Sequence, residues 1–396
     1  MGAEKKRPRG LAAQKAAKKA KVVEEPQEPN TNNAQTVVID KVVEEGDEMG
    51  EAAALFESAV EKAEKDPVGA LQLLRGTVHE SDRILRNWPE NETRPPPKFY
   101  LTYGSALYEL GRLTEDEEFE PFLEAAEERL QDGLDRFEEL TEKENDLDSA
   151  EKIRIAMAKV WIAKSQFNND DDNKASGAVN NAEDNIPELA TRALDTLDKA
   201  LNGTVELKPT ALIEIASIVQ NHGDLYSNLE SQNKFRDWAE KLLKRVLEDD
   251  ADNSRALSEL GLGKLSLANY WLEQADEQRD DDEENEENEE EEEEEQKKEL
   301  SKEEQNAYDA IIQAKKYFEQ ALSKAGDEAQ PQTYADLAEA LVNEANLVLS
   351  EEEQNKLYQT AVQHIKDAKS TAEKNSIEYN LPEGLQSFLE EFEEQE

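Results

Sequence analysis

The amino-acid sequence predicts an all-α protein built of stacked helices, with a basic start and an acidic insertion that do not fold. Alanine, leucine, glutamate and lysine dominate the 396 residues, while glycine (16) and proline (13) are scarce, a composition typical of helices. The same spacing of small and large apolar residues returns along the chain. The sign of the charge reverses after the first twenty-one residues, in a chain of formal net charge -48.

From about Met49 the apolar residues recur at helical spacing, beginning with Leu55, Val60, Leu71 and Leu74. Helix-breaking sequences interrupt this pattern. They are Trp88-Pro89 with Pro95-Pro96-Pro97, the loop 168–185, Lys208-Pro209 and Gln330-Pro331. We expect about a dozen helices and no strand.

A degenerate internal repeat places alanine, a large apolar residue four positions on, and a small or apolar residue three further on. The examples are Ala126/Leu130/Gly133/Leu134, Ala156/Val160/Ala163, Ala193/Leu197/Ala200/Leu201, Ala239/Leu243/Val246/Leu247, Ala314/Phe318/Ala321/Leu322 and Ala361/Ile365/Ala368. This is the second-helix spacing of a tetratricopeptide repeat, and Tyr103-Gly104 and Leu260-Gly261 fit the first helix. The prediction is a tetratricopeptide-like α-solenoid. An irregular helical bundle is the alternative, because generic helix packing also selects alanine and leucine.

The N-terminus carries a candidate nuclear import signal. Its residues are Lys5, Lys6, Arg7, Lys18, Lys19 and Lys21, arranged as two basic clusters with a ten-residue spacer. An import receptor reads such paired clusters in extended peptides. A solvated tail and an arm for nucleic-acid phosphates are the alternatives. Residues 1–48 hold little to bury and are expected to be disordered.

The expected domains are set by an acidic tract. Sixteen of the twenty residues from Asp276 to Glu295 are acidic, and like charges at this density offer no apolar face. We therefore expect helical repeats over 49–275, a disordered acidic insertion over 276–299 and a second helical repeat region over 300–396. The tract is either a solvated insertion or a site for basic partners.

Composition excludes several classes of protein. The chain has no cysteine, which rules out disulfides and thiolate metal sites and fits a reducing compartment. It has no apolar run long enough for a membrane span and no apolar signal core, so no membrane contact is expected. Its negative charge repels DNA and RNA, so direct nucleic-acid binding is not expected either.

The sequence offers no recognisable catalytic or cofactor site. The histidines are His79, His222 and His364, far apart along the chain, and His79-Glu80-Ser81-Asp82 lacks the spacing of an iron oxygenase. No phosphate-binding glycine loop, nucleophile elbow or metal-binding histidine pair occurs. We expect a non-enzyme without cofactor or metal.

The segment Gly76–Arg86 is unusual because its polar residues are varied. On one helix His79, Arg83 and Arg86 share a face, next to Asp82. These four residues form a candidate partner surface. The alternative is contacts within the helix array, such as His79 with a carboxylate or Asp82 with Arg86.

The chain resembles the fungal enhancer of translation termination family. The resemblance rests on the opening Lys-Lys-Arg-Pro-Arg-Gly-Leu with its second basic cluster, on Thr77–Arg86, and on the stretches Ala314–Leu322, Tyr334–Ala340 and Ala361–Ala368 after the acidic tract. The resemblance implies a nuclear protein that supports stop-codon recognition and is linked to a prolyl hydroxylase acting on a ribosomal protein. It implies no catalytic residues. The basic clusters here lie farther apart than is usual in that family.

Residues and resemblance together predict a non-enzymatic helical-repeat adaptor, located in the nucleus and also in the cytoplasm, that promotes correct translation termination. The expected partners are proteins: a ribosomal prolyl hydroxylase, the termination machinery and a nuclear import receptor. Basic partners suit an acidic array. The alternative function is an acidic chaperone of histones or ribosomal proteins.

Overall fold

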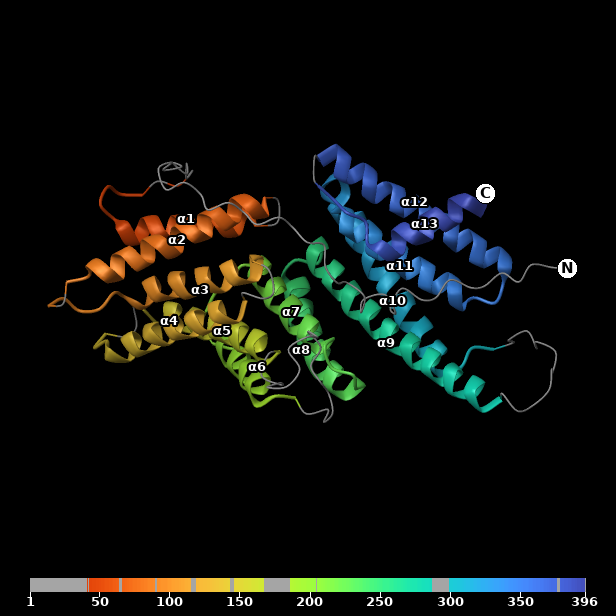
Figure 1. Ribbon diagram of the computed structural model, residues 1–396, viewed down its shortest axis with the longest axis horizontal. Coiled ribbons are helices and arrows are strands. Elements are labelled where there is room, and N and C mark those ends of the chain that lie inside the picture. Colours follow the sequence, from red (N-terminus) through yellow and green to blue (C-terminus); the bar gives the residue numbers. More distant parts are fainter. Residues whose placement is uncertain are drawn as a thin grey trace. The chain divides into compact units, whose positions relative to one another are not determined.

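The described part of the chain is all-α (Figure 1). The computed structural model describes residues 41, 43–63, 66–89, 91–114, 119–142, 146–166, 186–203, 205–286, 299–375 and 378–395. The helices over these residues are α1 (Glu48–Lys62), α2 (Pro67–Asn87), α3 (Pro97–Leu113), α4 (Phe119–Glu139), α5 (Leu147–Ser165), α6 (Glu188–Leu201), α7 (Pro209–Gly223), α8 (Leu229–Asp249), α9 (Ser254–Glu286), α10 (Lys302–Ala325), α11 (Pro331–Leu347), α12 (Glu351–Asn375) and α13 (Glu383–Gln395). The predicted fold class is confirmed over these residues.

Local sequence explains where these helices begin. The side chain of Asp47 accepts a hydrogen bond from the amide of Gly50 at 2.8 Å, which caps α1. At α10, Ser301 and Glu304 form a capping box: the Glu304 amide donates to the Ser301 hydroxyl at 3.1 Å, and the Ser301 amide donates to the Glu304 carboxylate at 2.8 Å. These caps satisfy amides that have no partner inside the helix.

Proline starts three more helices at the breakers read from the sequence. Pro97, Pro209 and Pro331 are the first residues of α3, α7 and α11. Proline suits this position because its missing N–H would have no intrahelical acceptor there. The predicted boundaries at these sites are confirmed, whereas the expected loop 168–185 lies outside the described residues.

Two compact units are present, and within each the helices pack as stacked pairs. One unit contains α1 to α6 within Glu25–Lys208, together with Asn221–Gln232; the other contains Pro209–Gln220 and Asn233–Glu396. In the N-terminal unit α1 pairs with α2, α3 with α4 and α5 with α6; α2 packs on α3, and α4 on α5. In the C-terminal unit α9 pairs with α10 and α11 with α12, and α10 packs on α11. Each unit thus has the tetratricopeptide-like arrangement rather than that of an irregular bundle.

The small–large–small repeat lies on the second helix of each of these pairs and also on α8, and most of its residues are buried. The members with at most 2% exposure are Ala126 and Leu130 of α4, Ala193, Leu197 and Ala200 of α6, Ala239, Leu243 and Val246 of α8, Ala314, Phe318 and Ala321 of α10, and Ala361, Ile365 and Ala368 of α12. The same spacing occurs in α2 as Ala70, Leu74 and Thr77, which our sequence analysis missed because threonine replaces the last small apolar residue. We call these residues the second-helix seam.

One predicted member of the repeat was wrong. Ala156, Val160 and Ala163 lie on α5, which is the first helix of the pair α5–α6, and Ala156 is only partly buried. The small residues of α5 that are 0% exposed are instead Ala150, Ala158 and Ser165. Alanine is frequent on both helices of a pair, so the spacing alone did not distinguish them.

Glycine on the first helix lets the two helices of a pair approach closely. A Cβ added to Gly104 of α3 would lie 2.6 Å from Cγ of Leu130 on α4. A Cβ added to Gly261 of α9 would lie 2.5 Å from the ring of Phe318 on α10. Both glycines therefore face the large residue of the second-helix seam.

The domain limits expected from the sequence remain predictions. Helix α1 begins at Glu48, beside the expected limit at residue 49, and α10 begins at Lys302. Helix α9 ends at Glu286, beyond residue 276 where the acidic insertion was expected to start. The remainder of that insertion up to residue 298 lies outside the described residues, as do residues 1–40.

Replacing Gly104 by alanine should destabilise the N-terminal unit, because the new methyl group overlaps Leu130. We expect a loss of about 1–3 kcal/mol in the free energy of unfolding, which exceeds the gain of about 1 kcal/mol from helix propensity. The free energy of unfolding is measured by urea denaturation followed by circular dichroism.

Gly76→Ala in α2 is the matched control. Its Cβ would meet only Leu55, at 3.8 Å, so the substitution should be neutral or stabilising. Equal stability of the two variants would contradict the close packing of α3 on α4.

Candidate functional site

The segment Gly76–Arg86 lies on α2, and two of its three buried positions are small and polar; the third is Ile84. Thr77 and Ser81 are both 0% exposed, and the Thr77 hydroxyl donates to the carbonyl of Leu73 at 3.0 Å. A hydroxyl bonded back to its own helix can be buried at a close helix contact. The varied composition of this segment therefore reflects, in part, packing inside the helix pairs.

Two of the four predicted surface residues connect neighbouring helices. Arg83 forms an ion pair with Glu48 of α1 at 3.0 Å and a second one with Glu80. The hydroxyl of Tyr103 on α3 donates to the carboxylate of Asp82. The Asp82–Arg86 contact considered from the sequence is replaced by this bond to Tyr103. Both residues thus help to hold α1, α2 and α3 together.

His79, Asp82 and Arg86 are exposed on α2, so these three residues are the part of the predicted surface that faces solvent. Their role in binding a partner stays a prediction. The import-signal residues Lys5, Lys6, Arg7, Lys18, Lys19 and Lys21 lie outside the described residues.

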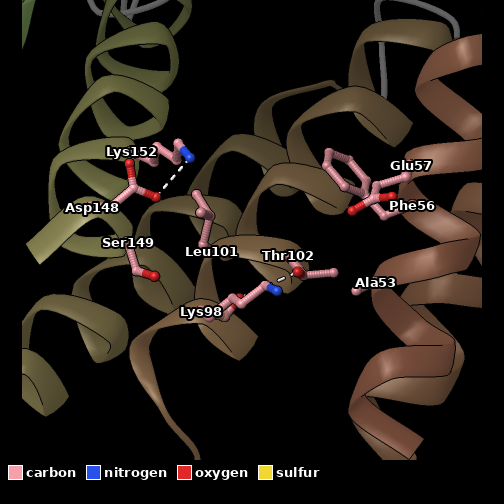
Figure 2. A pocket seen from close by; sticks show the side chains of 9 residues that line it. All are labelled: Ala53, Phe56, Glu57, Lys98, Leu101, Thr102, Asp148, Ser149 and Lys152. Atoms are coloured by element: carbon pink, nitrogen blue, oxygen red, sulfur yellow. Dashed lines mark hydrogen bonds and ion pairs between the residues drawn. The ribbon is translucent and has the colours of Figure 1, made fainter. Parts of the chain in front are cut away.

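The first helices of the N-terminal unit form a face of their own. Helix α1 packs on α3 and α3 packs on α5, in addition to the contacts each makes within its pair. We call this the first-helix face. It holds a cavity of about 390 Å³, shown in Figure 2. The cavity is lined by Ala53, Phe56 and Glu57 of α1, Lys98, Leu101 and Thr102 of α3, and Asp148, Ser149 and Lys152 of α5.

Most charges in this cavity are already paired. Lys152 bonds to Asp148 at 2.6 Å, one turn away on α5. Glu57 accepts from Lys41 at 2.7 Å, and these bonds to Glu57 and Glu61 raise the pKa of Lys41. Lys98, in the first turn of α3, has no ion pair with any carboxylate of the described residues. It is exposed at the edge of a partly apolar cavity.

Sequence reasoning missed this cavity. Lys98, Leu101 and Thr102 follow the helical periodicity of α3, on a stripe separate from that of Gly104. The first-helix signature Tyr103-Gly104 would have located this stripe. The sequence could not show which other helices supply the remaining two sides of the cavity.

The C-terminal unit carries a partly buried carboxylate on α9 and a buried one on α11. Asp336 is 6% exposed, and burial raises its pKa to about 7, with further upward contributions from Glu339 and Glu259. Burial likewise raises the pKa of Glu259, against the effect of a hydrogen bond from Ser217. The Asp336 carboxylate accepts from Gln332 at 2.7 Å. Burial raises the pKa of Tyr379, and the charge of Asp336 raises it further.

Metal binding finds no support in the described residues. Within them, no group of three or more histidine, aspartate or glutamate side chains is placed to hold an ion. His222 is buried, with its Nε2 2.9 Å from the hydroxyl oxygen of Tyr226. Burial lowers the pKa of His222 to about 4, so the imidazole is neutral at pH 7.

None of the helices described is both long and apolar enough to cross a membrane.

Comparison with known proteins finds a matching family over the N-terminal part of the chain. Residues 2–166 match the family described as "Nuclear pore complex subunit Nro1". Over part of its length, the chain is a distant homologue of the Nro1 and enhancer of translation termination 1 proteins. A "Negative regulator of ofd1" from Schizosaccharomyces pombe is 40% identical over 103 residues, 24% of this chain and 26% of the relative.

A second relative carries the name expected from the sequence. "Enhancer of translation termination 1" of Meyerozyma guilliermondii is 29% identical over 129 residues, 33% of this chain and 28% of the relative. The matches with both curated relatives therefore span about a quarter of those proteins. Their names refer to the regulation of another protein and to translation termination.

Solved structures with a similar course of the chain include the nuclear import adaptor Nro1 of S. pombe. It shows 20% sequence identity and a TM-score of 0.48, covering 87% of this chain and 99% of that one. The C-terminal part of a TPR repeat-containing protein from Cytophaga hutchinsonii matches with 11% identity and a TM-score of 0.33, covering 82% and 98% of the two chains.

Removing the charge of Asp336 should make the stability of the C-terminal unit less dependent on pH. A carboxyl whose pKa is raised by folding binds its proton more tightly in the folded state, so its contribution is lost as the pH rises from about 4 to above 7. At about 1.4 kcal/mol per pKa unit, Asp336→Asn should be more stable than the wild type by a few kcal/mol at pH 8 and nearly equal to it at pH 4. Urea titrations across this range measure the difference.

Asp327→Asn provides the control, since Asp327 is exposed and pairs only with Lys374 at 3.2 Å. The buried-carboxyl account fails if Asp336→Asn is less stable than the wild type at pH 8.

Proposed function

We propose that this protein is a non-enzymatic helical-repeat adaptor that promotes correct translation termination through protein contacts. The observation that carries the proposal is the similarity to the proteins named enhancer of translation termination 1. The stacked pairs support it, because such arrays present long faces to partner proteins without any catalytic group. The partners we propose are the termination machinery and a ribosomal prolyl hydroxylase.

The link to a hydroxylase has a separate basis. The name "Negative regulator of ofd1" belongs to the S. pombe relative, which therefore regulates another protein. For the present chain, the hydroxylase follows from the family resemblance of its sequence. His79 and Arg86 on α2 are one proposed contact surface, and the first-helix face is the other.

We also propose that the protein enters the nucleus through its basic N-terminus. The support is the pair of basic clusters in a chain of net charge -48, together with the import-adaptor title of the S. pombe protein. An import receptor is then a further partner, bound at residues 1–24. The negative charge of the remaining chain keeps nucleic acids from competing for most of the surface.

Loss of the protein should increase stop-codon readthrough. A dual-luciferase reporter in a deletion strain should show higher readthrough, and the full chain should restore the wild-type level. A chain lacking residues 287–295 should restore it as well, because this deletion removes glutamates beyond α9 and leaves the helix intact.

The same assay separates the two functions considered. If the 287–295 deletion fails to restore termination while the protein remains folded, the acidic chaperone replaces the adaptor. If the deletion strain itself shows normal readthrough, the termination role is wrong.

Import can be tested apart from termination. Residues 1–24 fused to a fluorescent reporter too large for passive diffusion should accumulate in the nucleus. A fusion with Lys18, Lys19 and Lys21 replaced by alanine should remain cytoplasmic, since one of the two clusters is gone. Cytoplasmic fluorescence of the unmodified fusion would refute the import signal.

A further inference from the structure

The cavity on the first-helix face has the size and composition of a small binding site. Its volume of about 390 Å³ lies within the range of about 300–1,000 Å³ typical of ligand pockets. Figure 2 shows its three sides, formed by side chains of α1, α3 and α5. Because three helices from three successive pairs form it, the cavity exists only in the stacked array.

Its lining combines apolar surface with one lysine, Lys98, that forms no ion pair within the described residues. Phe56 of α1 and Leu101 of α3 are partly buried and supply the apolar surface. Lys152 pairs with Asp148 at 2.6 Å and Glu57 pairs with Lys41 at 2.7 Å, while Lys41 also pairs with Glu61 at 3.1 Å. Lys98 remains without a carboxylate partner in the described part of a chain that has 94 acidic and 46 basic residues. A partner that brings its own carboxylate would complete this site.

The Thr102 hydroxyl adds an acceptor. It donates to the carbonyl of Lys98 at 3.2 Å, so its oxygen is left to accept a hydrogen bond from outside. In Figure 2, Lys98 extends from α3 toward α1, on the same side as Thr102. An N–H, a carboxylate and an apolar group can therefore be bound side by side.

We propose that this cavity binds the carboxyl-terminal residue of an extended peptide from a partner protein, with an apolar last side chain. Lys98 binds the terminal carboxylate, Phe56 and Leu101 contact the side chain, and Thr102 accepts from the last amide. This inference depends on the proposed adaptor role.

An internal acidic residue fits the cavity less well than a chain terminus. In an extended peptide, successive side chains point in opposite directions, so an aspartate and its apolar neighbour cannot both enter one cavity. The last residue of a chain carries its carboxylate and its side chain on the same Cα.

The test uses three pools of fluorescent octapeptides and the full-length protein at about 0.15 M salt. The first seven positions are random in each pool. The last residue is leucine with a free carboxylate, leucine as the amide, or glutamate as the amide. We expect the free-acid leucine pool to be retained roughly five- to tenfold better than either amide pool.

Variants assign the retention to the cavity. Lys98→Ala should remove the preference for the free acid, and Lys98→Arg should keep most of it. Ala53→Leu, which fills the cavity without changing its charge, should also reduce retention. Lys199→Ala, an exposed lysine of α6, is the matched control and should bind like the wild type.

Equal retention of the leucine acid and its amide would overturn the proposal, as would a Lys98→Ala protein that keeps its helicity and its preference. Preferential retention of the glutamate pool would show that the cavity binds a side-chain carboxylate, which would contradict the proposal that it binds the carboxyl terminus of a peptide. The peptide measurements are made in solution and do not depend on the readthrough assay. A negative peptide result therefore refutes the peptide site but not the termination role, and a negative readthrough result refutes the termination role but not the peptide site.

Discussion

The close approach of paired helices is the constraint on which the rest of this structure depends. Each second helix places alanine, or another small residue, one turn before or after a large apolar residue, and these positions are almost fully buried. Where the large residue is Leu130 or Phe318, glycine lies opposite on the first helix. Small residues bring the helix axes together, so the large residue fills the remaining space at normal packing density. A helix pair hides its apolar stripe only when the next pair covers it.

Stacking on this seam gives the first helices a continuous face. In the N-terminal unit α3 packs on both α1 and α5, so side chains far apart in sequence meet around one cavity. Ion pairs across helices add to the order of the array. Glu127 of α4 accepts from Trp161 and Lys164 of α5, at 2.8 and 2.5 Å, and Arg192 of α6 lies 4.0 Å from the centre of the Trp161 ring. Such contacts contribute little free energy individually, but they fix the register of neighbouring pairs.

The fold was largely predictable from the sequence because its signals are local. Proline at Pro97, Pro209 and Pro331 marks helix starts, and the alanine spacing marks the second helices. The α5 assignment failed because first and second helices share this composition. Helix α9 continues to Glu286, although the acidic insertion was expected to begin at residue 276.

The site was much less predictable. Asp82 and Arg83 stood out by their chemistry, yet their partners, Tyr103 and Glu48, lie on other helices. Lys98 did not stand out, because a lysine becomes unusual only when its neighbours are known to be neutral or already paired. The buried state of Asp336 was hidden for the same reason. Contacts between pairs decide these properties, and no spacing within one helix encodes them.

Site-specific photocrosslinking tests most directly the claim that the stacked array presents its first-helix face to partner proteins. The chain has no native cysteine, so a single cysteine carries the label without ambiguity. Ser149→Cys places the label in the cavity of the first-helix face, and Asp195→Cys places it on an exposed position of α6. In cells with normal termination, the account predicts a partner protein crosslinked from position 149 and not from position 195. Crosslinking from position 195 alone would contradict it.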